Sequence, residues 1–501
     1  MTGPTRPKLI LAVVDGLRPS ALDAAIEQGR APVHALVRAR GTATEAAAAF
    51  PSVTPCCAAT IATGRLQDHH RIPAMNWYSR AEGRYVEYGS SFGASRRFGI
   101  NRQLVDTVYA MNAEHLDPDT PTVFESLDDA GVRTAGTTYL MYRGRHEHTV
   151  SRETALTRIA GQTLFRKPVK GPRELFYADI FASRQTGCRS QMGMPGLRDQ
   201  HSGCVGEYLL EHDLFDFLLL SLPDNDTHSH KYGPDAQVES IAEADRQLQR
   251  VLEPAGGASR FLEDGALIVM ADHSHALVEE RVDLLEAIGE RFRVAGPTRS
   301  GRRSGDGPEV AVCPSQRGAM LYALGDEDER DADVVALATA ALELEGVDLI
   351  CHRHDGVAVI TSRRGALAFA PGEETADVRG GRWIVRGSLD VLEARVEDGV
   401  LLSDEYPDAL ARVWAALACP TSGDVILSAT PGYEFADWGG ADHVGGGSHG
   451  SLHRSDSLGA LLFAGVDAPR SADWSIRDVA GMVRAHFGLP AEEAPPVLSL
   501  G

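Results

Sequence analysis

The sequence predicts an α/β protein with a mainly parallel central sheet and helices on both faces of that sheet. Short apolar runs, such as residues 215–221 (FDFLLLS) and 266–271 (ALIVMA), alternate along the chain with segments of helical periodicity. Strands that are apolar throughout are buried on both faces, the usual situation in parallel sheets covered by helices. The 43% hydrophobic and 24% charged residues are ordinary for globular domains, which excludes a disordered chain and a coiled coil.

The elements of this core follow from the same alternation, taken in chain order. The first apolar run, residues 8–14 (KLILAVV), ends at Asp15-Gly16 and is followed by a helical segment. The predicted strands are residues 8–14, 133–138, 215–221, 266–271 and 460–464. The predicted helices are residues 19–28, 122–130, 237–252 and 475–487.

Two kinds of segment interrupt the core, which we assign to residues 1–275 and 420–501. Residues 276–419 contain short β-type pieces, 356–361 (GVAVIT) and 382–385 (RWIV), and are expected to form a small inserted α+β subdomain. Residues 77–116 are rich in Arg, Tyr, Gly and Ser and are expected to be cap loops over one end of the sheet. Residues 151–205 are polar and basic and are expected to cap the site as well.

The net charge of −21 narrows the possible partners. A nucleic-acid polymer or an anionic lipid surface needs a basic face on the protein, so we expect neither partner. No apolar run reaches the roughly 18 residues of a transmembrane helix. The first apolar run leads directly into Asp15 without a signal-peptide pattern, so a cytoplasmic protein is expected. The oligomeric state is left open.

The seven cysteines are scattered, and no Cys-x-x-Cys pair exists among them. This spacing argues against a disulfide scaffold and against a cysteine zinc cluster. We therefore expect most of the cysteines to be buried free thiols.

Aspartate and histidine recur next to four of the predicted strands. A single Asp at a strand end is explained by helix capping, and a single His is more often structural than a ligand. Four clusters at one edge of a sheet favour a site, and mixed Asp and His ligands suit Zn²⁺ or a related metal. Two such ions would form a clamp for displacement at phosphorus. The clusters are Asp15, Asp224–His230, Asp272–His275 and His449.

A nucleophile is offered by Thr54 in the segment Pro51-Ser-Val-Thr54-Pro55, which precedes an apparent helix ending at Gly64. The start of a helix favours an anion, because its free N–H groups and its dipole are positive there. The local sequence alone favours a simple Thr N-cap. A metal beside Thr54 would reverse this preference, because it would lower the pKa of the hydroxyl.

The order and spacing of these motifs resemble the alkaline phosphatase superfamily, most closely its type I phosphodiesterase/nucleotide pyrophosphatase branch, which includes phosphonoacetate hydrolase. The resemblance implies an alkaline phosphatase-like fold and spans most of the chain. His70 and Ile72 fall where the family usually has His-Gly-Ile. The segments that carry the resemblance are VVDG with Asp15, PSVT with Thr54, Asp226–Pro234, Asp272-His273 and His449-Gly450.

The resemblance also implies two divalent metal ions, with Zn²⁺ expected and Mn²⁺ or Fe as alternatives. One ion would be bound by Asp226, His230 and His449. The other would be bound by Asp15, Asp272, His273 and the oxygen of Thr54, which would be the nucleophile. The remaining histidines near these motifs are expected to be supporting or structural residues: His228, His275, His443 and His453.

One ambiguity concerns the middle motif, because Asp224 and His228 have the same spacing as Asp226 and His230. We choose the second pair because His230 lies at the family's distance from Gly233-Pro234, and Asp224/His228 remains the alternative.

The chain also departs from the family pattern. Cys57 stands where nucleotide pyrophosphatases usually have an Asn that touches a phosphate oxygen, and Ser274 replaces a glycine. The segment Cys313-Pro-Ser-Gln-Arg317 superficially resembles a sulfatase signature, but its proline is misplaced, so a sulfatase is disfavoured.

These motifs predict a metal-dependent hydrolase of small phosphoric esters, acting on phosphodiester or nucleotide pyrophosphate bonds through a phospho-threonine intermediate. The alternatives are a phosphomonoesterase or a phosphonate hydrolase of the same superfamily. A transferase or mutase with the same metal core is a third option. A non-catalytic binding protein is disfavoured, because Thr54 and all six other proposed ligands are intact.

Overall fold

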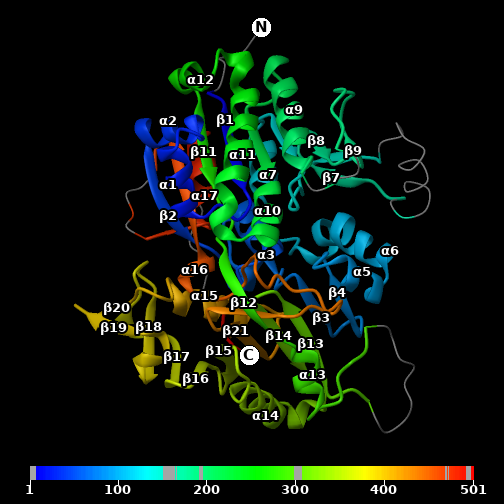
Figure 1. The fold of residues 1–501 in the computed structure, drawn as a ribbon, viewed down its shortest axis with the longest axis vertical. Helices are drawn as coiled ribbons and strands as arrows, with labels where there is room; N and C mark the ends of the chain where they lie inside the picture. The colour runs from blue at the N-terminus through cyan, green and yellow to red at the C-terminus, as the bar shows by residue number, and fades with distance from the viewer. Residues whose placement is uncertain are drawn as a thin grey trace.

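The computed structural model describes residues 7–150, 164, 166–190, 194, 196–297, 307–468, 471, 473–491 and 498–500 (Figure 1). A nine-stranded sheet forms its centre, and five of the eight strand pairs in this sheet are parallel. This confirms the predicted fold class. In spatial order the strands are β25 (Trp474–Ser475), β2 (Thr42–Ala47), β24 (Leu458–Ala464), β11 (Ala266–Met270), β1 (Leu9–Val14), β10 (Phe217–Leu222), β5 (Thr134–Thr137), β8 (Glu174–Tyr177) and β9 (Phe181–Ala182).

Helices cover both faces of this sheet. Successive side chains of a strand point to opposite faces, and both sets are apolar, so each face needs a covering layer. In β1, Ile10, Ala12 and Val14 pack into one apolar cluster. The alternate residues Leu9, Leu11 and Val13 pack into another. The first cluster is completed by α1 (Pro19–Glu27), α2 (Pro32–Arg40), α9 (Arg198–Glu211), α11 (Gln237–Leu252) and α12 (Ala258–Asp264). The second includes residues of α3 (Thr54–Thr63), α7 (Val123–Asp129) and α17 (Asp478–His486). All four predicted helices are confirmed to within three residues at each end.

The strand β24 runs against the direction of its neighbour β11, with Leu461 opposite Met270 and Ala464 opposite Leu267. All five predicted strands exist, but the apolar pattern did not reveal this reversal. Its consequence is geometric: the amino end of β24 lies at the edge where β1, β10 and β11 have their carboxyl ends. Segments that precede β24 therefore meet segments that follow the parallel strands.

The expectation that residues 77–116 form loops is wrong, whereas their role as a cap stays a proposal. The segment forms a hairpin of β3 (Asn76–Ser79) and β4 (Arg84–Glu87), followed by helical turns. The helices hide apolar residues among their Arg and Ser residues, and Phe98, Val108 and Met111 are buried. The helical turns are α5 (Phe92–Phe98), α6 (Ile100–Val105) and the π-helix η1 (Asp106–His115).

A second nine-stranded sheet lies in the lower half of Figure 1. It takes β21 from beyond residue 419, so the division of the chain at residues 276 and 419 stays a proposal. The helix α15 (Ala409–Ala418) packs on it, and α13 (Leu284–Gly289) and α14 (Arg330–Leu342) cover another apolar cluster. Its strands are β13 (Val310–Ser315), β14 (Gly318–Ala323), β21 (Val425–Ala429), β15 (Val347–His354), β16 (Val357–Ser362), β17 (Gly365–Ala376), β18 (Arg382–Gly387), β20 (Val400–Ser403) and β19 (Ala394–Glu397).

The second expected cap segment, residues 151–205, falls partly outside the described residues, which omit 151–163, 165, 191–193 and 195. Its described part includes β7 (Val169–Gly171), which pairs with β6 (His146–His148), and the sheet strands β8 and β9. It also includes a disulfide between Cys188 and Cys204, which the scattered cysteines did not predict. The other five cysteines are buried free thiols, as expected. Within the part of the chain that is described, no helix is long and apolar enough to cross a bilayer.

Candidate metal centre and active site

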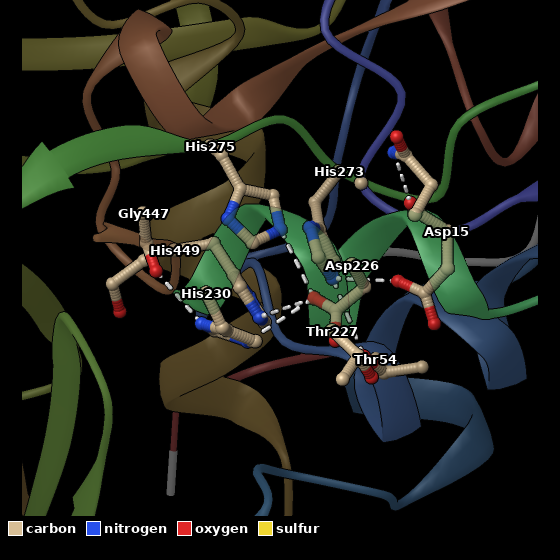
Figure 2. A network of polar contacts seen from close by, with 12 residues as sticks. Asp15, Thr54, Asp226, Thr227, His230, His273, His275, Gly447 and His449 are labelled. Carbon is tan, nitrogen blue, oxygen red and sulfur yellow. Dashed lines mark hydrogen bonds and ion pairs between the residues drawn. The ribbon is translucent and has the colours of Figure 1, made fainter. Parts of the chain in front are cut away.

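Thr54 begins the helix α3 and is not its N-cap. The N-cap is Val53, no side chain caps the helix, and Pro55 occupies the first turn. The remaining residues of α3 are buried, whereas Thr54 is half-buried. Its Oγ1 lies 3.3 Å from Nε2 of His273 (Figure 2). The hydroxyl therefore faces the predicted metal ligands instead of satisfying the backbone of its own helix.

Four side chains form a first group of potential ligands, which we call the Asp226 group: Asp226, His230, His275 and His449. Asp226 and His230 lie one turn apart on α10 (Asp224–Tyr232), which follows β10. His449 directly follows the short strand β23 (Gly447–Ser448), and His275 directly precedes β12 (Ala276–Val282), its pairing partner. Figure 2 shows the three rings converging on the Asp226 carboxylate.

Three side chains form a second group, the Asp15 group: Asp15, Asp272 and His273. Asp15 follows β1, and Asp272 and His273 follow the neighbouring strand β11. Nε2 of His273 lies 3.5 Å from Oδ1 of Asp15 and 3.5 Å from Oδ2 of Asp272. The carboxyl edge of the sheet thus brings together residues more than 250 positions apart, as the strand-end clusters predicted.

The electrostatics of the Asp15 group fit a cation. Burial, and then the Asp272 and Asp226 carboxylates, raises the pKa of Asp15 well above its usual value. Its Oδ1 is buried and has no hydrogen-bond partner. Buried carboxylates that crowd together without compensation are costly, and a divalent ion removes that cost.

The imidazoles are oriented so that Nε2 faces the carboxylates. The Nδ1–H of His230 donates to the Gly447 carbonyl at 2.7 Å, and that of His449 donates to the Ser52 carbonyl at 2.8 Å. Burial lowers the pKa of His449 to about 4, so this ring is neutral and turns the Nε2 lone pair toward Asp226. An acceptor that faces an acceptor calls for a cation between them, and carbonyl partners at Nδ1 are typical of metal-binding histidines.

The alternative pair Asp224/His228 lies outside both groups. Asp224 accepts hydrogen bonds from the Arg198 guanidinium at 2.8 Å and from the backbone N–H groups of Gly196 and Asp199. His228 packs its ring against Tyr232. These contacts attach the first turn of α10 to the start of α9, so the geometry favours Asp226 and His230 as ligands.

Other residues support the site without joining either group. Nδ1 of His443 contacts the buried Glu434 carboxylate at 2.7 Å, and the His443 ring stacks on His230. His453 lies apart from both groups and contacts Glu405. The sequence did not point to Gln316, whose amide lies 3.4 Å from His230 Nε2. It sits in the tight turn between β13 and β14, and no local pattern distinguishes such a residue from an ordinary turn residue.

Two further residues that the family pattern singled out, Cys57 and His70, also find their place. Cys57 is completely buried within α3, and burial together with the nearby Asp272 raises the pKa of its thiol well above the usual value. His70 is completely buried below α3, with Thr60 Oγ1 3.1 Å from its Nε2. Both residues thus belong to the packing around α3.

A parallel sheet whose carboxyl edge gathers carboxylates, imidazoles and a hydroxyl at a helix start defines a phosphoric ester hydrolase of the alkaline phosphatase superfamily. More narrowly, the chain belongs to the type I phosphodiesterase / nucleotide pyrophosphatase family, whose model matches residues 9–452. Enzymes of this family depend on metal ions, and the two groups are the candidate ligands here. No curated protein matches the sequence significantly.

Solved structures share this fold. Phosphonoacetate hydrolase from Sinorhizobium meliloti 1021, in complex with phosphonoformate, has a TM-score of 0.56 at 16% identity, with 96% of each chain covered. Human ectonucleotide pyrophosphatase / phosphodiesterase 5 has a TM-score of 0.55 at 14% identity, with 97% of this chain and 96% of that chain covered. An inactive variant of the murine protein, in complex with AMP, has a TM-score of 0.56 at 13% identity, with 98% and 97% covered. At these identities the likeness concerns the fold.

Proposed function

We propose that this enzyme hydrolyses phosphodiester or nucleotide pyrophosphate bonds of small substrates through a phospho-threonine intermediate at a site for two divalent ions. One observation carries the proposal: the uncapped hydroxyl of Thr54 lies 3.3 Å from His273, at the start of α3 and beside the Asp15 group. A Thr with a merely structural role would cap its own helix or donate to a nearby carbonyl.

The proposed ligands divide between two ions. Asp226, His230 and His449 would hold one, and Asp15, Asp272, His273 and Thr54 would hold the other, with Zn²⁺ favoured over Mn²⁺ or Fe by the imidazole share. When bound, such ions supply the positive charge that lowers the pKa of a hydroxyl and stabilises the charged phosphoryl group.

The chain's own residues account for the covalent steps. Thr54 gives up its proton to solvent, Oγ1 forms a bond to phosphorus, and the bond from phosphorus to the leaving oxygen breaks, with that oxygen taking a proton from solvent. A water molecule then loses a proton and attacks phosphorus through its oxygen, the bond to Thr54 Oγ1 breaks, and Oγ1 takes up a proton, so the hydroxyl is restored. The first turn of α3 presents its N–H groups and the positive end of its dipole to the anion throughout.

A phosphomonoesterase or phosphonate hydrolase of the same superfamily is the second candidate. It is supported by Cys57, which takes the position of an expected phosphate-binding Asn and is completely buried. The fold likeness to phosphonoacetate hydrolase points the same way. A non-catalytic binding protein is less favoured, because Thr54 meets a potential ligand group.

We further propose a cytoplasmic enzyme that does not act on nucleic-acid polymers or at membranes. The net charge of −21 supports the exclusion of these two partners, because long polyanions and anionic lipids are repelled by an acidic surface. A small anionic ester is attracted instead by the local charge of bound cations.

The test compares Thr54→Ala with Thr54→Ser, both loaded with Zn²⁺ or Mn²⁺. The substrates are bis(p-nitrophenyl) phosphate, p-nitrophenyl phosphate, dinucleotides and phosphonoacetate. Thr54→Ala is expected to lose at least about a thousandfold in kcat, and Thr54→Ser to keep most of it, because serine supplies the same hydroxyl. Wild-type rates for Thr54→Ala would exclude Thr54 as the nucleophile, and the preferred substrate would decide between the two candidates.

A further inference from the structure

His275 occupies an unexpected position in the Asp226 group. It lies in the loop between β11 and β12, is 1% exposed, and is expected from the sequence only as a supporting residue. Its Nε2 lies 3.0 Å from Oδ1 of Asp226. The corresponding distances are 3.1 Å for His230 and 3.4 Å for His449, so His275 is the nearest of the three rings.

We propose that His275 is a third imidazole ligand of the ion at Asp226, so that four protein side chains surround this ion. The inference rests on the proposed function for the existence of the ion. Ligand atoms about 2.0–2.1 Å from a tetrahedral zinc ion lie about 3.3 Å from one another. The three distances to Asp226 Oδ1, 3.0, 3.1 and 3.4 Å, lie close to this value, and the four ligand atoms all lie within 4.8 Å of one another.

The ring contacts show that His275 completes this arrangement. The His275 ring lies 4.8 Å from the His230 ring and 5.0 Å from the His449 ring, centroid to centroid. The three nitrogens thus approach one point from different directions (Figure 2). A simple hydrogen bond that steadies Asp226 needs one ring, whereas three converging rings are the geometry of a coordination sphere.

Two glycines make the space for His275. A Cβ added at Gly16 would lie 2.5 Å from His275 Nε2, and one added at Gly447 would lie 3.0 Å from its Nδ1. Gly16 directly follows Asp15, and its φ of 66° is one that other residues rarely adopt. The backbone on both sides of the ring is therefore shaped so that His275 can reach Asp226.

A fourth protein ligand changes what this ion can do. Catalytic zinc sites usually have three protein ligands and an open position, whereas four protein ligands are typical of structural zinc sites. The ion at Asp226 would accept a substrate oxygen only by expanding its coordination. With His275 as a ligand this ion is also expected to be held more tightly than without it, so His275→Gln should make it leave earlier when a chelator is added.

The test counts imidazole ligands by X-ray absorption spectroscopy of the zinc-loaded protein. In an Asp272→Asn/His273→Ala background, which disables the Asp15 group, we expect one zinc ion with three imidazoles. Adding His275→Gln is expected to reduce the count to two. Adding His443→Gln, which removes a ring that stacks on His230 outside the group, is expected to leave it at three. Two imidazoles in the background variant would overturn the proposal.

A second measurement covers the case in which the background variant does not fold. The otherwise unmodified protein with both ions bound should contain four imidazole ligands per chain if His275 coordinates, and three if it does not. Failure of this inference and failure of the proposed function give different results. Three imidazole ligands per chain in a protein with full phosphodiesterase activity would refute the role of His275 alone. Four imidazole ligands in a protein that hydrolyses no phosphoric ester would refute the proposed function alone.

Discussion

The imidazole rings of His273 and His449 stack face to face, with their centroids 3.6 Å apart and an angle of 14° between their planes. His273 belongs to the Asp15 group and His449 to the Asp226 group. The two groups are therefore in direct contact, and the proposed ions would share one continuous set of ligands.

Asp15→Asn is expected to reduce the bound zinc from about two ions per chain to about one. Burial and the neighbouring Asp272 make the negative charge of Asp15 unfavourable unless a cation is bound. The amide of Asn carries no such charge, so the Asp15 group of this variant is expected to bind an ion only weakly. Metal analysis after gel filtration measures the stoichiometry. Asp23→Asn, at an exposed ion pair with Arg38, is the control and should retain both ions. Two ions in the Asp15→Asn protein would contradict the assignment.

Arg317→Met is expected to lower the free energy of unfolding by about 3–5 kcal/mol, because it leaves a buried carboxylate without its partner. Arg317 Nη1 lies 2.9 Å from Asp456 Oδ1, and both side chains are 0% exposed. Urea unfolding of the metal-loaded protein measures the change. Arg395→Met breaks an exposed pair with Glu397 and should leave the free energy of unfolding nearly unchanged, because water screens such a pair. Equal effects of the two substitutions would refute a structural role for the buried pair.

The native protein is expected to show no thiols that react rapidly with Ellman's reagent, and five after denaturation without reductant. All five free cysteines are buried. For Cys57, burial is the main cause that raises the pKa of the thiol well above its usual value. A buried thiol that stays protonated is a poor nucleophile. Fast reaction of one thiol in the native protein, lost in Cys57→Ala, would instead place Cys57 at an accessible surface.

His70→Gln is expected to flatten the acid side of the stability curve. Burial, and then the neighbouring His69, lowers the pKa of His70 from 6.5 to about 3 in the folded protein. Between pH 6.5 and 3 the unfolded chain therefore binds the extra proton, so the stability from His70 is present above pH 6.5 and is lost as the pH falls through this window. Urea unfolding from pH 7 to 4 measures the difference. The exposed His354→Gln should reproduce the wild-type slope, and a wild-type slope for His70→Gln would refute the prediction.

The sequence predicted those parts of the fold that depend on local pattern. The apolar runs located β1, β10 and β11, and Asp15, Asp272 and His273 follow from the rule that sites lie beyond the carboxyl ends of parallel strands. The direction of β24 was not predictable, because an apolar run looks the same in either orientation. The helices at residues 92–115 were not predicted, because the Arg-, Gly- and Ser-rich composition of this segment is typical of loops. Its few buried apolar residues, such as Phe98 and Met111, are too widely spaced to stand out.

The limits at the site have a similar cause. The four-residue spacing is the same in Asp224/His228 and Asp226/His230. The family's distance from Gly233-Pro234 favours the second pair, and the contacts of Asp224 with Arg198 and Asp199 support that choice. His275 was recognised as a neighbour of the motif but not as a member of the Asp226 group, because its approach depends on space left by Gly16 and Gly447. Such three-dimensional space has no signature along the chain.

The antiparallel insertion of β24 between β2 and β11 has a consequence for how the enzyme is made. During synthesis the ribosome releases Asp15, Thr54, Asp226 and Asp272 long before His449 and β24. A growing chain therefore carries its carboxylates with the sheet still open at the β2–β11 junction, and the Asp226 group stays incomplete until nearly all of the chain has emerged. Chains that end before His449 lack a ligand of the Asp226 group, so retention of the ion at that group would separate them from longer chains in the cell.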